Sequence, residues 1–234
     1  MSLTLLEIVQ QVVGEISSDI ATPTAITSSQ DQTVVQLFRL CNRVGMDLVR
    51  EYPWRRLVTE YTFPTVASTS TYDLPTDFDR MVPDSHYDRT NDWQNLGPES
   101  SQGWQWLNTG LSTVTQLRWR LYLNQIKFYS TPTAVYTMAY EYVSRYWVLA
   151  TGGSVPTKER FSVDTDTCVF ADDVMTLGLK YQWYRAKGLD YEQVFTEFRR
   201  AVDACKGQDI PEGRKSLSPA PRQALNIPEG NWTL

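Results

Sequence analysis

The chain of 234 residues is 41% hydrophobic and 21% charged, a composition that predicts a globular protein with one sizeable core. Its formal net charge of −5 argues against a general nucleic-acid-binding protein, since such proteins are ordinarily basic. No apolar run approaches the ~20 residues that span a bilayer, and no signal-peptide pattern opens the chain, so we expect a cytoplasm-like compartment and no membrane contact.

Two amphipathic helices are expected in residues 3–53. Thr4 and Glu7 form a capping-box pattern, and the apolar residues that follow them keep a helical spacing. Asp31 is a suitable N-cap for the second helix. That helix must end near Tyr52, because the residue before a proline avoids the α region.

The periodicity changes in residues 57–149, where we expect an antiparallel β insertion. Side chains alternate in residues 57–63, and a Ser- and Thr-rich turn separates this run from residues 72–74, which favours a hairpin. Residues 116–129 and 134–148 are dense in the Tyr, Trp, Val and Ile that suit a pleated surface.

Residues 83–110 have no clear period, and we expect a long loop or short irregular strands there. The segment contains Trp93, Trp104 and Trp106. It also contains His86, the one histidine of the chain, which we expect to be exposed to solvent because no nucleophile motif lies nearby.

Helical spacing returns in residues 171–206. Asp172 and Asp173 place negative charge in a first helical turn, where the helix dipole favours it. Gly188 is a suitable C-terminal glycine, and Asp190 can cap the next helix, so we expect a helical hairpin.

These elements predict an α+β fold. Its core is a four-helix bundle of the two N-terminal and two C-terminal helices, from which the antiparallel β insertion projects. Residues 1–206 then form a single domain, and residues 207–234 an extended C-terminal arm.

Four prolines prevent the arm from continuing as a helix or as a central strand. The arm is nevertheless richer in apolar residues than a solvating tail. Those residues are Ile210, Leu217, Leu225, Ile227, Trp232 and Leu234. We expect them to bind another surface, of the same subunit or of a neighbour, with Leu225, Ile227 and Trp232 as the main anchors. The alternative is an unstructured terminus.

The sequence contains no motif of an enzyme, cofactor site or metal site. Three cysteines, Cys41, Cys168 and Cys205, are too few and too scattered for a disulfide framework or a zinc site. Asp164 and Asp166 suggest a calcium loop but lack its glycine and its distal glutamate, so we interpret them as turn residues. We therefore expect no catalytic, cofactor or metal-binding residues.

Two groups of arginines lie beside aromatic residues: Arg50, Trp54, Arg55 and Arg56, and Arg118 and Arg120 around Trp119. Cations next to aromatic rings are typical of nucleic-acid contacts. In an acidic protein we favour ion pairs within or between subunits, and we predict these five arginines and Trp54 as intersubunit contacts. A nucleic-acid-binding protein remains the alternative.

Four strings in this order resemble tailed-bacteriophage head–tail connector proteins, which are also called adaptor or head-completion proteins and include tail tubular protein A. The strings are VGMDLVREYPW (44–54), YDLPTDFDR (72–80), YEYVS (140–144) and the hairpin at 178–191. Each string is only moderately specific, but their order and spacing extend the resemblance over nearly the whole chain. Residues 83–110 do not align with the family pattern.

The resemblance implies a structural virion protein without catalytic residues. It implies a ring of twelve subunits under the portal, with the arm docked on the portal protein and the β region facing the next tail or neck component. Genomic DNA would pass through the channel without sequence-specific binding. The protein would reside in the virion, and in the host cytoplasm during assembly. Trp93, Trp104 and Trp106 leave a glycan-binding tail component as a further alternative.

Overall fold

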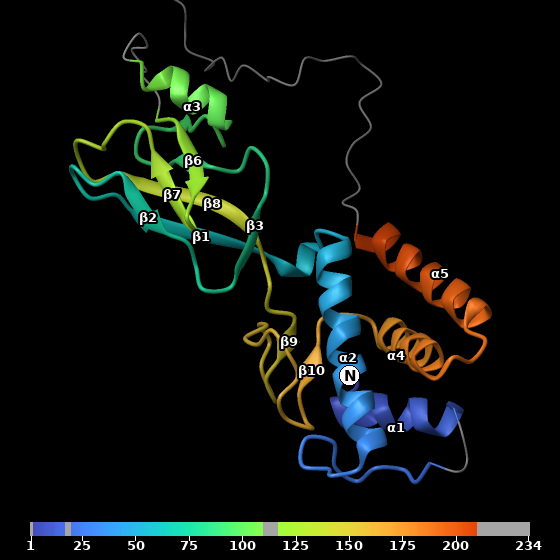
Figure 1. Ribbon diagram of the computed structural model, residues 1–234. Helices are drawn as coiled ribbons and strands as arrows, with labels where there is room; N and C mark the ends of the chain where they lie inside the picture. The colour runs from blue at the N-terminus through green and yellow to red at the C-terminus, as the bar shows by residue number, and fades with distance from the viewer. Residues whose placement is uncertain (1, 17–19, 110–116, 210–234) are drawn as a thin grey trace, which may run out of the picture.

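The computed structural model describes residues 2–16, 20–109 and 117–209 and places them in two parts, a helical body and a β lobe (Figure 1). The helical body contains α1 (Leu5–Ile16), α2 (Gln32–Glu51), α4 (Asp172–Lys187) and α5 (Glu192–Asp209). A single 3-10 turn, η1 (Arg55–Leu57), leads from α2 into the β lobe. A small sheet of β9 (Val148–Leu149) and β10 (Thr167–Cys168) lies beside the helical body.

The described part of the β lobe consists of eight strands and one short helix. They are β1 (Val58–Pro64), β2 (Thr71–Asp73), β3 (Phe78–Met81), β4 (Tyr87–Asp88), β5 (Trp93–Gln94), α3 (Ser101–Leu107), β6 (Trp119–Tyr122), β7 (Gln125–Phe128) and β8 (Thr137–Ser144). The predicted combination of helices with antiparallel sheets is confirmed.

Capping interactions begin the N-terminal helices as predicted. The backbone N–H of Thr4 donates to Glu7 Oε2 at 2.8 Å, and the N–H of Glu7 donates to Thr4 Oγ1 at 3.3 Å, which completes the capping box. Asp31 Oδ1 accepts a hydrogen bond from the N–H of Thr33 at 2.8 Å. These bonds satisfy backbone donors that a helix leaves unpaired in its first turn.

The helix ends also follow local sequence signals. Helix α2 ends at Glu51, two residues before Pro53. Gly188 ends α4 with a φ of 69°, a left-handed conformation that glycine adopts without steric cost. Helix α5 continues to Asp209, three residues beyond Lys206, where we expected the helix to end.

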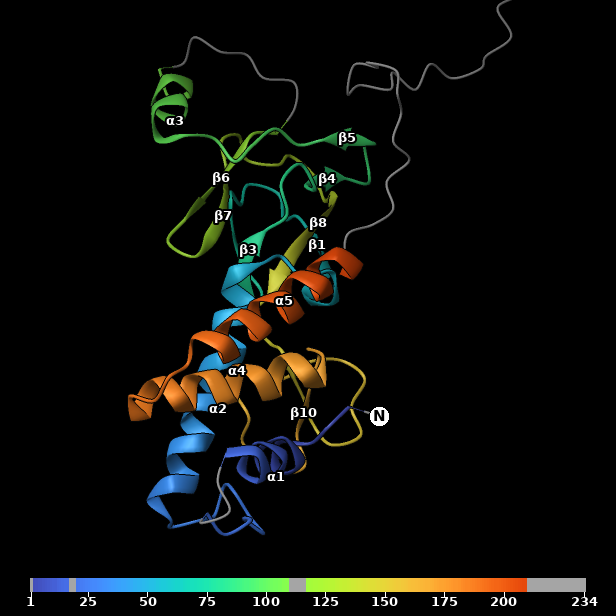
Figure 2. The ribbon, with the colours of Figure 1, turned by 90° about the vertical axis from the view of Figure 1, so that its right-hand side faces the viewer.

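Helix α4 is the centre of the helical body, because it packs against α1, α2 and α5. Helix α2 crosses α1 at a large angle in both ribbon views (Figures 1 and 2). The four predicted helices are therefore present, but the predicted four-helix bundle is not confirmed.

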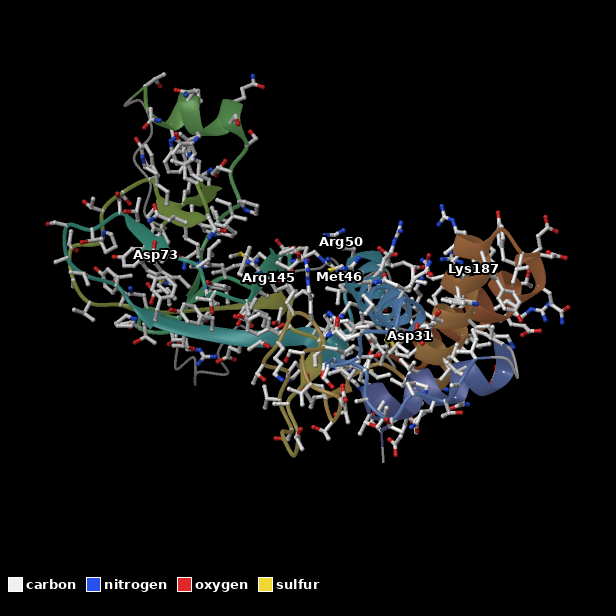
Figure 3. All side chains as sticks on the ribbon, turned by 60° about the horizontal axis from the view of Figure 1, so that its bottom comes forward. Asp31, Met46, Arg50, Asp73, Arg145 and Lys187 are labelled. Carbon is white, nitrogen blue, oxygen red and sulfur yellow. The ribbon has the colours of Figure 1, made fainter. Side chains whose placement is uncertain are left out.

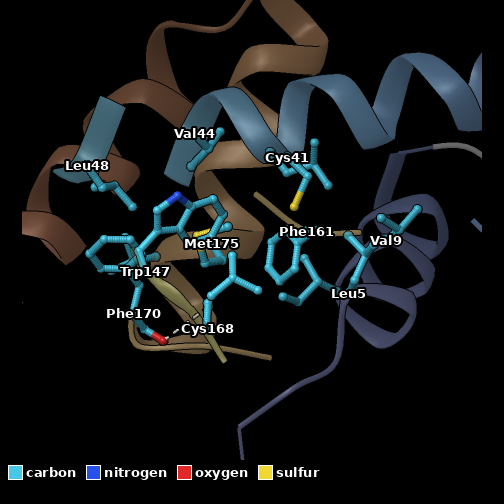
Figure 4. Close-up of a cluster of buried hydrophobic side chains, with 14 of the residues drawn as sticks. Leu5, Val9, Cys41, Val44, Leu48, Trp147, Phe161, Cys168, Phe170 and Met175 are labelled. Atoms are coloured by element: carbon cyan, nitrogen blue, oxygen red, sulfur yellow. Dashed lines mark hydrogen bonds between the residues drawn. The ribbon is translucent and has the colours of Figure 1, made fainter. Parts of the chain in front are cut away.

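Trp147 lies at the middle of the core of the helical body and is fully buried (Figure 4). Its ring meets Phe161 edge-on, with 4.9 Å between ring centroids, and lies 5.8 Å from the Phe170 ring. On the side of α2 the indole lies directly against Gly45, where a Cβ atom would overlap the ring. The absence of a side chain at Gly45 thus creates the space for Trp147.

Strand β8 organises the β lobe. It pairs with β1 along one edge and with β3 and β4 along the other, and β5 extends the sheet from β4. A second antiparallel sheet has the order β2-β7-β6. Aromatic side chains from both sheets dominate the core between them: Phe63, Phe78, Trp119, Ile126, Phe128, Met138, Tyr140 and Tyr142.

The predicted hairpin between residues 57–63 and 72–74 is wrong. The chain does turn between them, but β1 pairs with β8 and β2 pairs with β7. The long partner β8 brings Tyr140 and its neighbours onto the same face as Phe63, and the two rings lie 6.2 Å apart. Burial of this aromatic face explains the choice of a distant partner over the adjacent one.

Two other segments contain more structure than the sequence indicated. Residues 116–129 include the β6–β7 hairpin, whose turn residues Leu123 and Asn124 have φ angles of 49° and 59°. Residues 83–110 contain the short strands that we considered, together with the unpredicted helix α3. The Oγ atom of Ser100 caps α3 by accepting a hydrogen bond from the N–H of Gly103 at 3.0 Å.

Candidate assembly surfaces

His86 is buried, which corrects the expectation of an exposed loop residue. Its ring stacks between Trp119 and Tyr140, at centroid distances of 5.0 and 5.6 Å, and its Nδ1 lies 2.9 Å from Nδ2 of Asn95. Burial lowers the pKa of His86 to about 4. The imidazole therefore acts as a neutral aromatic component of the β-lobe core.

The buried imidazole makes the stability of the protein depend on pH. An unfolded histidine has a pKa of about 6.5, so between this value and about 4 the unfolded chain binds a proton that the native state excludes. Stability must fall as pH is lowered through this window, by about 2 kcal/mol between pH ~7 and pH ~5. Urea unfolding at the two pH values should show this loss.

His86→Phe provides the matched control for this prediction, because it keeps an aromatic ring in the site and removes the only histidine of the chain. The variant should lose little stability over the same pH interval. An equal loss in the variant and in the natural protein would contradict the assignment to His86.

The acidic residues that suggested a calcium loop are used to fix backbone. Asp164 accepts hydrogen bonds from the N–H groups of Ile26 and Thr27 at 3.1 and 2.8 Å. Asp166 is fully buried and pairs with Lys158 Nζ at 2.8 Å. Among residues 2–16, 20–109 and 117–209, no cluster of three or more His, Cys, Asp or Glu residues is arranged to hold a metal ion.

The first arginine group lies where the helical body meets the β lobe. Arg50, Arg55 and Arg56 are exposed. The Arg56 guanidinium donates to the carbonyl oxygen of Val169 at 3.1 Å. Arg50 lines a cleft of about 350 Å³ between α2 and the β lobe, opposite Arg145 (Figure 3).

Trp54, which we predicted as an intersubunit contact, lies in the core of its own subunit. Only 6% of its surface is exposed, and its Nε1–H donates to the carbonyl oxygen of Leu48 at 2.8 Å. Its ring also packs edge-on against Phe170. An indole held in this way has no surface to offer a neighbouring subunit while the helical body stays folded.

The second arginine group is used mainly within the subunit. Arg118 Nη1 pairs with Glu99 Oε1 at 2.6 Å. The Arg120 guanidinium lies over the Trp104 ring at 4.3 Å and near the Tyr122 ring at 4.7 Å. Both arginines flank the buried Trp119, so the predicted amphipathic strand is present and its charges have intrachain partners.

The root of the arm lies beside the first arginine group. Asp209, the last residue of α5, accepts a hydrogen bond from the N–H of Arg55 at 2.8 Å through its Oδ2 atom. A pocket of about 210 Å³ opens here between α5, α4 and the turn η1. Its lining includes Trp54, Arg56, Phe170, Val174, Cys205 and Gln208. The sequence offered no sign that the far end of α5 meets the start of β1. The six apolar arm residues, Ile210 to Leu234, lie outside the described residues.

Large apolar side chains are exposed on the β lobe, away from the helical body. Trp93 and Trp106 are 43% and 55% exposed, whereas Trp104 is buried under Arg120. Leu123, at the tip of the β6–β7 hairpin, is 77% exposed. The three tryptophans that suggested a glycan site therefore do not form one exposed set, but the lobe does present apolar contact surface.

Comparison with protein families identifies the kind of protein that carries these surfaces. A family model described as the SU10 adaptor protein matches residues 3–220, which include the helical body, the β lobe and the first part of the arm. The chain belongs to the SU10 adaptor protein family. The resemblance to phage head–tail connectors is thereby confirmed. Comparison with curated proteins gave no match.

The family describes a structural phage protein and not a class of enzyme. An adaptor acts through contacts with other proteins of the virion, so its surfaces carry its function. Within the described residues of this adaptor, no helix is long and apolar enough to cross a membrane. The arm root, the exposed arginines beside it and the apolar surface of the β lobe are the surfaces to consider.

Proposed function

We propose that this adaptor forms a closed ring beneath the portal and joins the phage head to the tail or neck. The observation that carries the proposal is the SU10 adaptor match over residues 3–220. In this arrangement the arm docks on the portal protein, the β lobe faces the next tail component, and genomic DNA passes through the channel of the ring. Twelve subunits would match the family ring.

The position of the arm supports its role as a tether. The arm leaves the subunit at Asp209, at one end of α5, where no described element continues it. Its apolar residues are spaced along a chain with four prolines, which suits an extended segment on a partner surface. A segment that orders on its partner can cover a large surface in spite of its small size.

Exposed charges support a ring of identical subunits. In a ring each subunit uses two different faces, and an arginine on one face can pair with a carboxylate of the neighbour. Arg50 and Arg55 are exposed, and no carboxylate of the described residues pairs with either guanidinium. We place these two arginines, with Arg56, at the subunit interface.

Purified adaptor mixed with purified portal should give rings visible by negative-stain electron microscopy. A chain that ends at Asp209 should lose portal binding because it lacks the arm. It retains the helical body and the β lobe, so the loss can be assigned to the arm. Deletion should begin at residue 210, since Asp209 belongs to α5 and binds Arg55.

A triple variant of the full-length chain separates loss of the apolar anchors from loss of chain length. Leu225→Ser, Ile227→Ser and Trp232→Ser together should weaken portal binding at least about tenfold, because burial of each large apolar side chain contributes ~1.5–3 kcal/mol. Ser218→Ala, Gln223→Ala and Asn226→Ala form the matched control in the same segment. Undiminished binding without the arm would overturn the tether, and absence of binding by the full chain would overturn the portal assignment.

A further inference from the structure

Strand β1 forms one edge of the main sheet. Backbone bonds at the end of this sheet show which groups of β1 face inward. The N–H of Thr65 donates to the carbonyl oxygen of Tyr136 at 2.8 Å, directly after the pair Pro64↔Thr137. Pairing alternates along an antiparallel ladder, so the residues of β1 with odd numbers bond to β8. The backbone groups of Glu60 and Thr62 therefore point away from the sheet.

The hydrogen bonds on the other side of β8 lead to the same assignment of inward and outward backbone groups. The N–H of Arg89, which follows β4, donates to the carbonyl oxygen of Thr137 at 2.8 Å, and the N–H of Val82 donates to that of Glu141 at 3.0 Å. The residues of β8 with odd numbers thus face β3 and β4. Those with even numbers are left to bond β1.

The outward edge of β1 has no partner among the residues that the structure describes. In those residues β1 pairs only with β8, and Glu60, Thr62 and Pro64 are exposed. A free edge of this length is a template for another strand. Two features limit uncontrolled pairing of this edge with other chains: Pro64 lacks an N–H, and Glu60 is charged. The amides of Glu60 and Thr62 are still available to an added strand.

The arm begins at the base of this edge. Asp209 is hydrogen-bonded to the backbone of Arg55, which lies three residues before β1. Figure 2 shows the end of α5 beside the start of β1. Strand β1 is about 23 Å long at ~3.3 Å per residue. The 12 residues from 210 to 221 can extend to about 40 Å, enough to reach either end of β1.

One stretch of the arm has the composition of a strand. Residues 222–227, Arg-Gln-Ala-Leu-Asn-Ile, contain neither proline nor glycine and are bounded by Pro221 and Pro228. Leu225 and Ile227 are two residues apart, so they would lie on the same face of a strand. The length of six residues is typical of strands in globular proteins.

The apolar face of β1 complements the apolar face of this stretch. Phe63 is buried in the core of the β lobe and Tyr61 packs beside it, so an added strand would place Leu225 and Ile227 next to an aromatic surface. On the solvent face, Arg222 would lie on the same side as Glu60, whose carboxylate already pairs with Arg89 at 2.9 Å, so this face adds no new ion pair. The added strand would thus be held by its backbone bonds and by apolar contacts.

We propose that in the unassembled adaptor residues 222–227 add to the free edge of β1 of the same chain as a further strand. The short connection from Asp209 gives the segment a high effective concentration at this edge and favours it over the arm of another copy. The contact goes beyond the proposed docking on the portal and does not depend on it. It would cover the edge until a partner takes the arm.

Residue-resolved amide hydrogen exchange on the full-length chain, without portal, tests the proposal. The amides of Glu60 and Thr62 should be protected in the natural chain. Ala224→Pro should raise their exchange rates at least about tenfold, because proline removes a donor from the added strand and restricts its neighbour. Ser216→Pro, in the same arm but outside residues 222–227, should leave the rates unchanged.

Fast exchange of both amides in all three chains would overturn the proposal. Protection that disappears on dilution would assign the added strand to the arm of another copy and would also overturn pairing within one chain. Portal binding of Ala224→Pro is measured separately, so a failure of β1 pairing is distinguishable from a failure of portal docking.

Discussion

Gly45→Ala is expected to lower the free energy of unfolding by about 3 kcal/mol, although alanine is the better helix former. The new Cβ would overlap Cη2 and Cζ2 of Trp147. That indole is fully buried and is held between Phe161 and Phe170, so neither the ring nor the helix can move without loss of packing. Urea unfolding followed by circular dichroism would measure the change.

Gly14→Ala is the matched control for Gly45→Ala. Gly14 also lies inside a helix, but a Cβ there would meet nothing within 4 Å, so this variant should gain up to about 1 kcal/mol. Trp147→Phe should restore part of the stability that Gly45→Ala loses, because the smaller ring vacates the overlapped space. If Gly45→Ala is as stable as the natural chain, the close contact with Trp147 is not what requires glycine.

Asp166→Ala is expected to cost about 3–4 kcal/mol, because it removes a buried anion from the donors that surround it. The carboxylate accepts hydrogen bonds from the N–H groups of Ser162 and Val163, both at 2.9 Å, and from Lys158 Nζ. The backbone carbonyl of Asp166 also accepts a bond from the N–H of Leu5 at 2.9 Å. Loss of the carboxylate would therefore loosen both the loop and the start of α1.

The stabilisation of the native state by Asp166 must depend on pH, in the direction set by a carboxyl group whose pKa is lowered. Burial by itself would raise the pKa of Asp166, but the bonds from Lys158, Ser162 and Val163 outweigh it and lower the pKa. A carboxyl of this kind stabilises the native state above its unfolded pKa of about 3.9, and the stabilisation is lost as pH falls through the folded value. The difference in stability between the natural chain and Asp166→Ala should thus be constant near neutral pH and shrink in acid.

Asp203→Ala is the surface control for Asp166→Ala. The Asp203 side chain is 65% exposed and lies 3.8 Å from Lys206, so its removal should cost less than about 0.5 kcal/mol. Equal losses for Asp166→Ala and Asp203→Ala would contradict the structural role of the buried pair.

The candidate surfaces were only partly predictable. The exposed arginines at the base of the β lobe could be named from their pattern, but Trp54 could not be distinguished from a surface residue, because its burial depends on Phe170 from another part of the chain. The burial of His86 could not be predicted from the sequence for the same reason. Its ring partners Trp119 and Tyr140 are more than 30 residues away in the sequence.

The sequence by itself determined the capped starts of α1 and α2, the end of α4 and the family of the protein. Capping at Thr4 and Asp31 and termination at Gly188 depend on residues within one turn, and such interactions form wherever the chain is placed. Only the tertiary structure decided which strands pair and where α5 ends in space. An alternating pattern shows which face of a strand is buried, but it does not identify the strand with which it pairs. That pairing depends on burial of the whole aromatic core, whose residues are far apart in the sequence. The position of Asp209 beside the start of β1, where the arm begins, likewise depends on the tertiary structure.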